Sequence, residues 1–275
     1  PMFRVPLRIG LIGLVLSAAA LAGPDVPDRH IEEALVAAGG NRAELERVLE
    51  HFRSGGDGEK LLAARFLIAH MPGHGYVRTV LRDKQGRVIR YDPLAYPDFK
   101  AALGALDALE KEHGELEFGR DDVVYDVETL KADFLIGHVD RAFEAWRGAP
   151  TRWRVGFEAF LEYVLPHRGS QEPVEDWITP LRARFGDLWS EHSEPAQVAA
   201  AVRKQIQNQV RFNERYYLHP TDQGFSEMLK SGQGRCEDLT NLDTFAMRSV
   251  AIAVAADYTP YWGHRDNNHA WTVML

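Results

Sequence analysis

The chain has 275 residues, of which 45% are hydrophobic, and a formal net charge of −8 at pH 7. A chain of this size can bury one or two ordinary hydrophobic cores. No basic stretch compensates the acidic balance, which excludes a general nucleic-acid binder and indicates a soluble, mildly acidic surface.

The first predicted element is an N-terminal apolar run. Arg4 and Arg8 precede an uncharged stretch that ends in small residues just before Gly23. The run is short for a membrane span, and a polar, proline-containing segment follows it. We therefore expect a secretory signal peptide at residues 1–23, rather than a retained anchor. The mature protein would be secreted or periplasmic, with no membrane attachment after cleavage.

Residues 24–190 are predicted to form a mostly helical supporting region. "NRAELERVLEHFR" opens with Asn41 as a candidate N-cap and Glu44 three positions later, close to a capping box. Further helical patterns cover residues 59–71, 97–114, 127–147 and 194–210. A short hairpin is expected around Lys84–Gly86. An aromatic helix stops at Pro166, and the polar loop "HRGSQEP" after it looks exposed.

The second predicted domain covers residues 191–275 and changes character near its end. A helix is expected from Cys236 to about Ser249. The apolar run "VAIAVAADYTPYW" then predicts a strand, "GHRDNNH" a turn, and "HAWTVML" a second strand. Helix, strand, turn and strand indicate an α+β fold.

The chemistry of the chain centres on Cys236, its single cysteine. Gly232 and Gly234 before it allow a close backbone approach to a helix start. The positive end of a helix favours a thiolate, and its free amides can hold an oxyanion. Glu237 and Asp238 oppose this by adding negative charge, so activation needs a cationic imidazole.

His269 is the better candidate for that imidazole. It opens the last strand, with Trp271 on the same face two residues later, whereas His264 lies in the turn and is expected to be solvated. Two alternatives stay open. The thiol can be half-buried and inert, or it can bind a metal with His264, Asp266 and His269. The second set matches no common zinc spacing, so no metal is predicted.

A resemblance adds to this interpretation. "GRCEDLTNLDTFAMRSVAIAVAADYTPYW" followed by "NNHAW" resembles the transglutaminase-like family of the papain-type thiol superfamily. Upstream, "FLEYVLPHRGSQEPVEDW" is similar to large secreted bacterial proteins with such a domain, and the likeness covers most of residues 58–275. It implies a Cys helix packed on antiparallel strands, with Cys236 as nucleophile and His269 as base.

The chain departs from the family pattern at one point. The family's third catalytic member is an Asp on the strand after the His strand, and the sequence stops at Leu275. Asp257 and Asp266 are the nearest acids, and neither has the expected position. We expect an incomplete domain with the Asp beyond residue 275, although a working Cys–His dyad and an inactive site remain alternatives.

These observations predict a secreted thiol-dependent acyl-transfer enzyme, a peptidase or amidase acting on a protein or peptide without a cofactor. The alternative is a catalytically inactive binding or scaffold module. Trp262, Trp271 and Gln233 are the predicted substrate-binding residues. The Cys236 sulfur and a His269 nitrogen are expected within roughly 3–5 Å, with the pKa of the thiol below its ordinary value of about 8.5.

Overall fold

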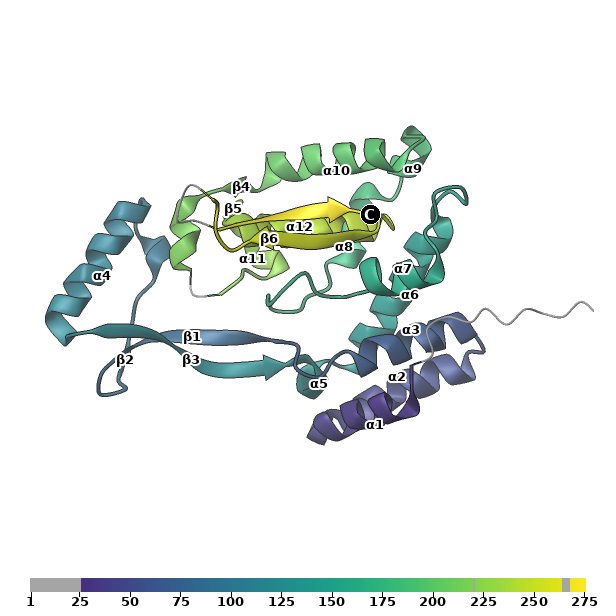
Figure 1. Cartoon of the computed structure of the whole chain (residues 1–275), viewed down its shortest axis with the longest axis horizontal. Helices are drawn as coiled ribbons and strands as arrows, with labels where there is room; N and C mark the ends of the chain where they lie inside the picture. The colour runs from purple at the N-terminus through teal and green to yellow at the C-terminus, as the bar shows by residue number, and fades with distance from the viewer. Residues whose placement is uncertain (1–25, 220, 264–267) are drawn as a thin grey trace, which may run out of the picture.

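The computed structural model describes residues 26–219, 221–263 and 268–275. The predicted signal peptide, His264 and Asp266 therefore lie outside the described residues. Helices and mostly antiparallel strands share the described chain, which confirms the α+β class (Figure 1). No helix within these three ranges is long and apolar enough to cross a membrane.

The N-terminal helices pack around one long helix, α6. The helical elements of this region are α1 (Asp28–Ala37), η1 (Gly39–Asn41), α2 (Arg42–Ser54), α3 (Gly58–Ala69), α5 (Asp126–Thr129), α6 (Ala132–Gly148), α7 (Phe157–Tyr163), α8 (Ile178–Phe185) and α9 (Leu188–Glu191). Helix α6 contacts α2, α3 and α8. Its buried face carries Leu135, Val139 and Phe143, which recur at helical spacing.

Asn41 occupies the N-cap position of α2, as predicted, but its side chain makes no capping hydrogen bond. Its side chain is buried and donates instead to the carbonyl oxygens of Val127 (3.1 Å) and Leu130 (2.8 Å). Glu44 accepts the N–H of Ala132 at the start of α6. Both polar groups satisfy backbone atoms far away in the sequence, because the fold buries those atoms where water cannot reach them.

An arm formed by residues 75–125 extends from the bundle (Figure 1). It contains β1 (Gly75–Asp83), β2 (Val88–Ile89), η2 (Pro93–Ala95), α4 (Phe99–His113) and β3 (Leu116–Tyr125). The strands are antiparallel in the order β2-β1-β3. The β1–β2 hairpin was predicted, but β3 was not, because Gly119 and two aspartates make its sequence a poor strand former. Pairing with β1 stabilises it, and Arg78 faces Asp122 across the two strands at 2.6 Å.

The C-terminal region surrounds α12. Its elements are α10 (Pro195–Gln209), β4 (Arg211–Phe212), η3 (Glu214–Leu218), α11 (Phe225–Ser231), β5 (Gln233–Gly234), α12 (Cys236–Ser249), β6 (Val254–Thr259) and β7 (His269–Met274). The predicted bounds of α12 are confirmed, and both predicted strands are present, although β6 is shorter than the predicted run of residues 250–262. The two strands pair from Thr259↔His269 to Val254↔Met274.

Helix α12 joins the two halves of the molecule. It packs against α8 from the supporting region, α10, and both C-terminal strands. Trp177 and Phe245 stack with ring centroids 4.9 Å apart, inside one hydrophobic core that runs through both regions. The boundary predicted between residues 190 and 191 falls in α9 and stays a prediction. Contacts from both regions therefore hold α12 in place.

Candidate active site

Local backbone geometry places Cys236 at the start of α12. The Arg235 N–H donates to Oδ2 of Asp238 (2.9 Å), and this bond closes the first turn. Gly234 is required here, since a Cβ at this position would lie 2.8 Å from the Asp238 Cβ. Gly232 ends α11 in the left-handed region, with φ of 63°. The two glycines therefore serve the close approach that the sequence indicated.

The thiol of Cys236 is buried, and its sulfur has three hydrogen-bond partners. It donates to Oε2 of Glu237 (3.2 Å) and lies 3.7 Å from the Tyr217 hydroxyl. The N–H of Ala270, at the start of β7, donates to the sulfur. Glu237 also lies 3.4 Å from the Arg235 guanidinium. The sulfur thus sits between a carboxylate, a phenol and a strand amide.

These surroundings favour the protonated thiol. Burial raises the pKa of Cys236 above its ordinary value, the Ala270 N–H lowers it, and Glu237 raises it again. The expected fall of the thiol pKa is therefore wrong for this arrangement. Burial and the contact with Cys236 raise the pKa of Tyr217 to about 12, so its hydroxyl keeps its proton.

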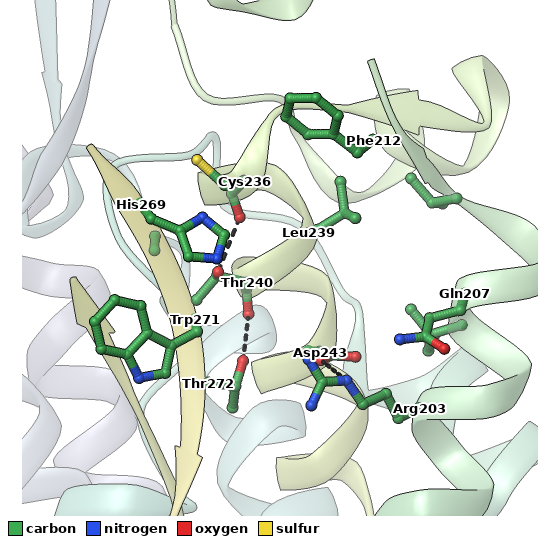
Figure 2. Close-up of a pocket in the computed structure, with 13 residues that line it drawn as sticks. Arg203, Gln207, Phe212, Cys236, Leu239, Thr240, Asp243, His269, Trp271 and Thr272 are labelled. Atoms are coloured by element: carbon green, nitrogen blue, oxygen red, sulfur yellow. Dashed lines mark hydrogen bonds and ion pairs between the residues drawn. The ribbon is translucent and has the colours of Figure 1, made fainter. Parts of the chain in front are cut away.

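His269 is exposed and lies between two indoles. Its ring centroid is 5.9 Å from that of Trp262 and 5.8 Å from that of Trp271. Within the described ranges, no hydrogen bond joins His269 to Cys236, and Figure 2 accordingly draws none between them. The predicted neighbours therefore share one site, but the sulfur is engaged by Glu237 instead of the imidazole.

Both predicted catalytic residues line one cavity of about 210 Å³. We call it the cysteine cavity; Cys236, His269, Ala270 and Trp271 line one end of it (Figure 2). Arg203 from α10 and Asp243 from α12 line the other end, with N and O atoms 3.5 Å apart. Cys236, Thr240 and Asp243 share one face of α12, as their spacing requires.

Two contacts hold β7 along this face. The Thr272 hydroxyl donates to the Thr240 carbonyl (3.3 Å; Figure 2), and the Ala270 N–H forms a hydrogen bond with the Cys236 sulfur. Because strand residues alternate between faces, Ala270 and Thr272 point toward α12. His269 and Trp271 also line the cysteine cavity.

The other predicted residues are placed differently. Trp262 touches His269 but lines no cavity that contains Cys236 among the described residues. Gln233 accepts a hydrogen bond from Asn213 through its amide oxygen and does not line the cysteine cavity either. Asp257 pairs across the strands with Trp271, two pairs beyond the His269 level.

Sequence reasoning missed Tyr217 and the amide of Ala270. Tyr217 is 19 residues before the cysteine and reaches it only because η3 folds back over the start of α12. The contribution of the Ala270 N–H could not be predicted, because every residue except proline has a backbone N–H and the residue type does not show where it will point. Glu237 was noticed as a charge, but its hydrogen bond to the sulfur depends on the rotamers of both side chains.

Comparison with known proteins gives one match. The family model of the transglutaminase-like superfamily matches residues 184–274. No curated protein and no solved structure matches the chain. The matched segment contains α10, α12 and the β6–β7 pair, with Cys236 and His269 inside it. This part of the chain is therefore a domain of the transglutaminase-like superfamily.

Proposed function

We propose that the chain is a thiol-dependent acyl-transfer protein, in which Cys236 attacks a carboxamide or peptide carbonyl and His269 moves the proton. The observation that carries this proposal is the cysteine cavity, where the first residue of α12 and the first residue of β7 line one opening. The family match supports it, because such domains typically use a cysteine for acyl transfer or proteolysis.

The start of α12 suits the charge that develops during the reaction. The first-turn amides of a helix lack internal partners, and the helix dipole is positive there. In the described ranges, the N–H of Cys236 donates to no other residue. It is available to the oxygen of a carbonyl under attack, as one donor of an oxyanion hole. We propose the Gln233 side-chain amide as the second donor; to donate there, it turns away from Asn213.

The proposed reaction proceeds in two halves. The Sγ–H proton passes to the His269 imidazole, the sulfur forms a bond to the carbonyl carbon, and the oxygen becomes an oxyanion. The C–N bond then breaks, and the imidazolium returns its proton to the leaving nitrogen. Water adds to the thioester in the same way, which releases the acid and restores the thiol. We favour hydrolysis over transfer to an amine by analogy with bacterial relatives of this superfamily.

Activation requires the sulfur to leave Glu237. Rotation about the Cα–Cβ bond moves Sγ between staggered positions without moving α12. The arrangement described above is the resting state in this proposal, with the thiol protonated. The inactive-module alternative draws on the same observation, because a thiol held by Glu237 is a weak nucleophile. We also propose that the protein is exported, with Trp262 and Trp271 bordering the bound substrate.

Acylation by p-nitrophenyl acetate tests the proposal. Intact-mass spectrometry should show one acetyl group on the parent chain and none on Cys236→Ser. His269→Ala should slow acetylation by about a hundredfold, the usual loss when a general base is removed. His51→Ala, which removes an exposed histidine from α2, is the control. Equal acetylation of Cys236 with and without His269 would assign the chain to the inactive modules.

A further inference from the structure

The loop at residues 167–172, which looked exposed in the sequence, is buried in part and closely fixed; Ser170 and Gln171 are exposed. His167, Arg168 and Glu172 are at most 7% exposed. The Arg168 guanidinium makes two hydrogen bonds of 2.5 Å to Asp126, and His167 Nε2 lies 3.0 Å from the same carboxylate. The supporting region thus holds the loop through the buried ion pair between Asp126 and Arg168.

The other side of this loop is bonded to itself and to α12. Glu172 accepts the N–H groups of Gly169 and Ser170, each at 2.8 Å. Arg248 of α12 donates to the carbonyl oxygens of Pro166 and Arg168. A Cβ on Gly169 would lie 2.4 Å from Oδ1 of Asn241, so the loop touches α12 directly. The position of Ser170 is therefore set by both regions.

Ser170 lines two cavities. The histidine cavity, of about 190 Å³, is lined by Ser170, Glu237, Asn241 and His269. The outer cavity, of about 470 Å³, is also lined by Ser170 and lies between the ends of α3 and α7. Its size falls within the range of ligand pockets. A molecule bound at His269 that passes over Ser170 enters the outer cavity next.

The walls of the outer cavity are mostly apolar. Phe66, Leu67, Met71, Tyr163 and Pro166 supply the apolar area, and the polar lining residues are His70, His74, Glu162, His167, Arg168 and Ser170. Such a lining fits a hydrophobic side chain rather than a charged one. The Ser170 hydroxyl donates to Asp222 and accepts from Asn241. One lone pair is left to accept an N–H from an extended peptide.

We propose that the outer cavity is a remote subsite for a hydrophobic side chain of a peptide substrate whose backbone crosses Ser170 on its way to Cys236. This inference rests on the proposed function and adds the substrate class. The occupant is argued from continuity, because Ser170 lines both cavities and His269 lines the nearer one. Hydrophobic residues on a substrate should then accelerate reaction at one fixed distance from the attacked carbon.

Covalent peptide probes test the subsite without turnover. One series carries a chloromethyl ketone at the C-terminus of short glycine peptides, and a second carries a chloroacetyl group at the N-terminus, so that both chain directions are covered. In each, the sulfur forms a C–S bond, the C–Cl bond breaks, chloride leaves, and the thiol proton passes to solvent. A single phenylalanine replaces glycine at successive positions. Labelling of Cys236 is followed by mass spectrometry, with iodoacetamide as the small reagent.

Two tryptophan variants on α7 make a matched pair. Glu162 lines the outer cavity and Glu158, one turn earlier, does not; both are exposed. At one position, phenylalanine should increase the labelling rate of the parent chain about tenfold or more over glycine. Glu162→Trp should abolish that ratio, and Glu158→Trp should keep it. The ratio is taken within each variant, so a general change in thiol reactivity cancels.

Three results would overturn the inference. If the phenylalanine preference survives in Glu162→Trp, the outer cavity does not receive the side chain. If no position shows a preference while the glycine probes still label Cys236, the subsite is absent and the proposed function stands. If iodoacetamide labels Cys236 and no peptide probe does, peptides are not substrates, and both proposals fail.

Discussion

Replacing Glu237 by glutamine should make the Cys236 thiol more reactive. The carboxylate accepts the S–H proton at 3.2 Å and opposes ionisation of the sulfur. Coulomb's law gives about 1.3 kcal/mol for two unit charges at this separation in a water-like medium. Arg235 lies 3.4 Å from the same carboxylate and offsets part of that repulsion. Because 1.4 kcal/mol is a factor of about ten, the thiolate fraction at neutral pH should rise about three- to tenfold.

The expected change in the pH profile of Cys236 alkylation follows from the negative charge that is removed. Removing a neighbouring negative charge lowers the pKa of a thiol, so Glu237→Gln should react faster than the parent below the thiol pKa. The two profiles should meet at high pH, where both sulfurs are ionised. The rate of iodoacetamide alkylation, followed by mass spectrometry over a range of pH, measures the profile both below and above the thiol pKa. Glu227→Gln removes an equal charge that pairs with His219 instead, and should leave the profile unchanged.

Superimposed profiles for the parent and Glu237→Gln would refute this reasoning. They would mean that the hydrogen bond from the thiol to Glu237 is not populated in solution. A slower Glu237→Gln variant would have a different meaning, namely that the carboxylate accepts the proton productively. In that case Glu237 would be a base, and His269 would lose its proposed role.

Two further predictions concern stability. Burial would raise the pKa of Asp126, but hydrogen bonds, first of all from Arg168, hold it at about 2. The lowered pKa stabilises the folded chain by about 2 kcal/mol above pH 4, and this contribution is lost as the pH falls from about 4 to 2. Urea unfolding of the parent and Asp126→Asn should show that acid-dependent step only in the parent, and equal slopes would contradict it. Gly234→Ala should destabilise the chain by about 1–3 kcal/mol, because its Cβ would crowd Asp238. As a control, Gly104→Ala at an exposed mid-helix position should stabilise the chain against unfolding by about 0.5–1 kcal/mol. If Gly234→Ala causes no loss of stability, the first turn of α12 can shift to accept the Cβ.

Local patterns predicted the C-terminal elements well. The helix beginning at Cys236 and the strand at His269 have their expected bounds because glycine breaks, apolar runs and the change to polar residues all lie within a few positions of each other. Strand β3 had no such signal. Its aspartates disfavour a strand locally, whereas in the fold they pair with arginines of β1 across the ladder.

The loop at residues 167–172 shows a second limit of sequence reasoning. Its residues are polar, so they indicate exposure. Arg168 and Glu172 are nevertheless buried, because protein groups satisfy them: Asp126 pairs with Arg168, and backbone amides of the loop donate to Glu172. Residue type records what a side chain needs, whereas the fold decides whether water or protein supplies it. Polar composition therefore cannot separate a solvated loop from a fixed cavity wall.

The cysteine illustrates the same limit at the site itself. Reasoning from residue types selected His269 as the partner, since a thiolate needs a cation. In the structure the nearest acceptor is Glu237, which adjoins the cysteine in sequence and reaches its sulfur across the first turn of α12. Glu237 and His269 can each accept the same proton, but only transfer to His269 leaves an ion pair that favours attack. A substrate that displaces Glu237 from the sulfur would therefore activate the thiol as it binds.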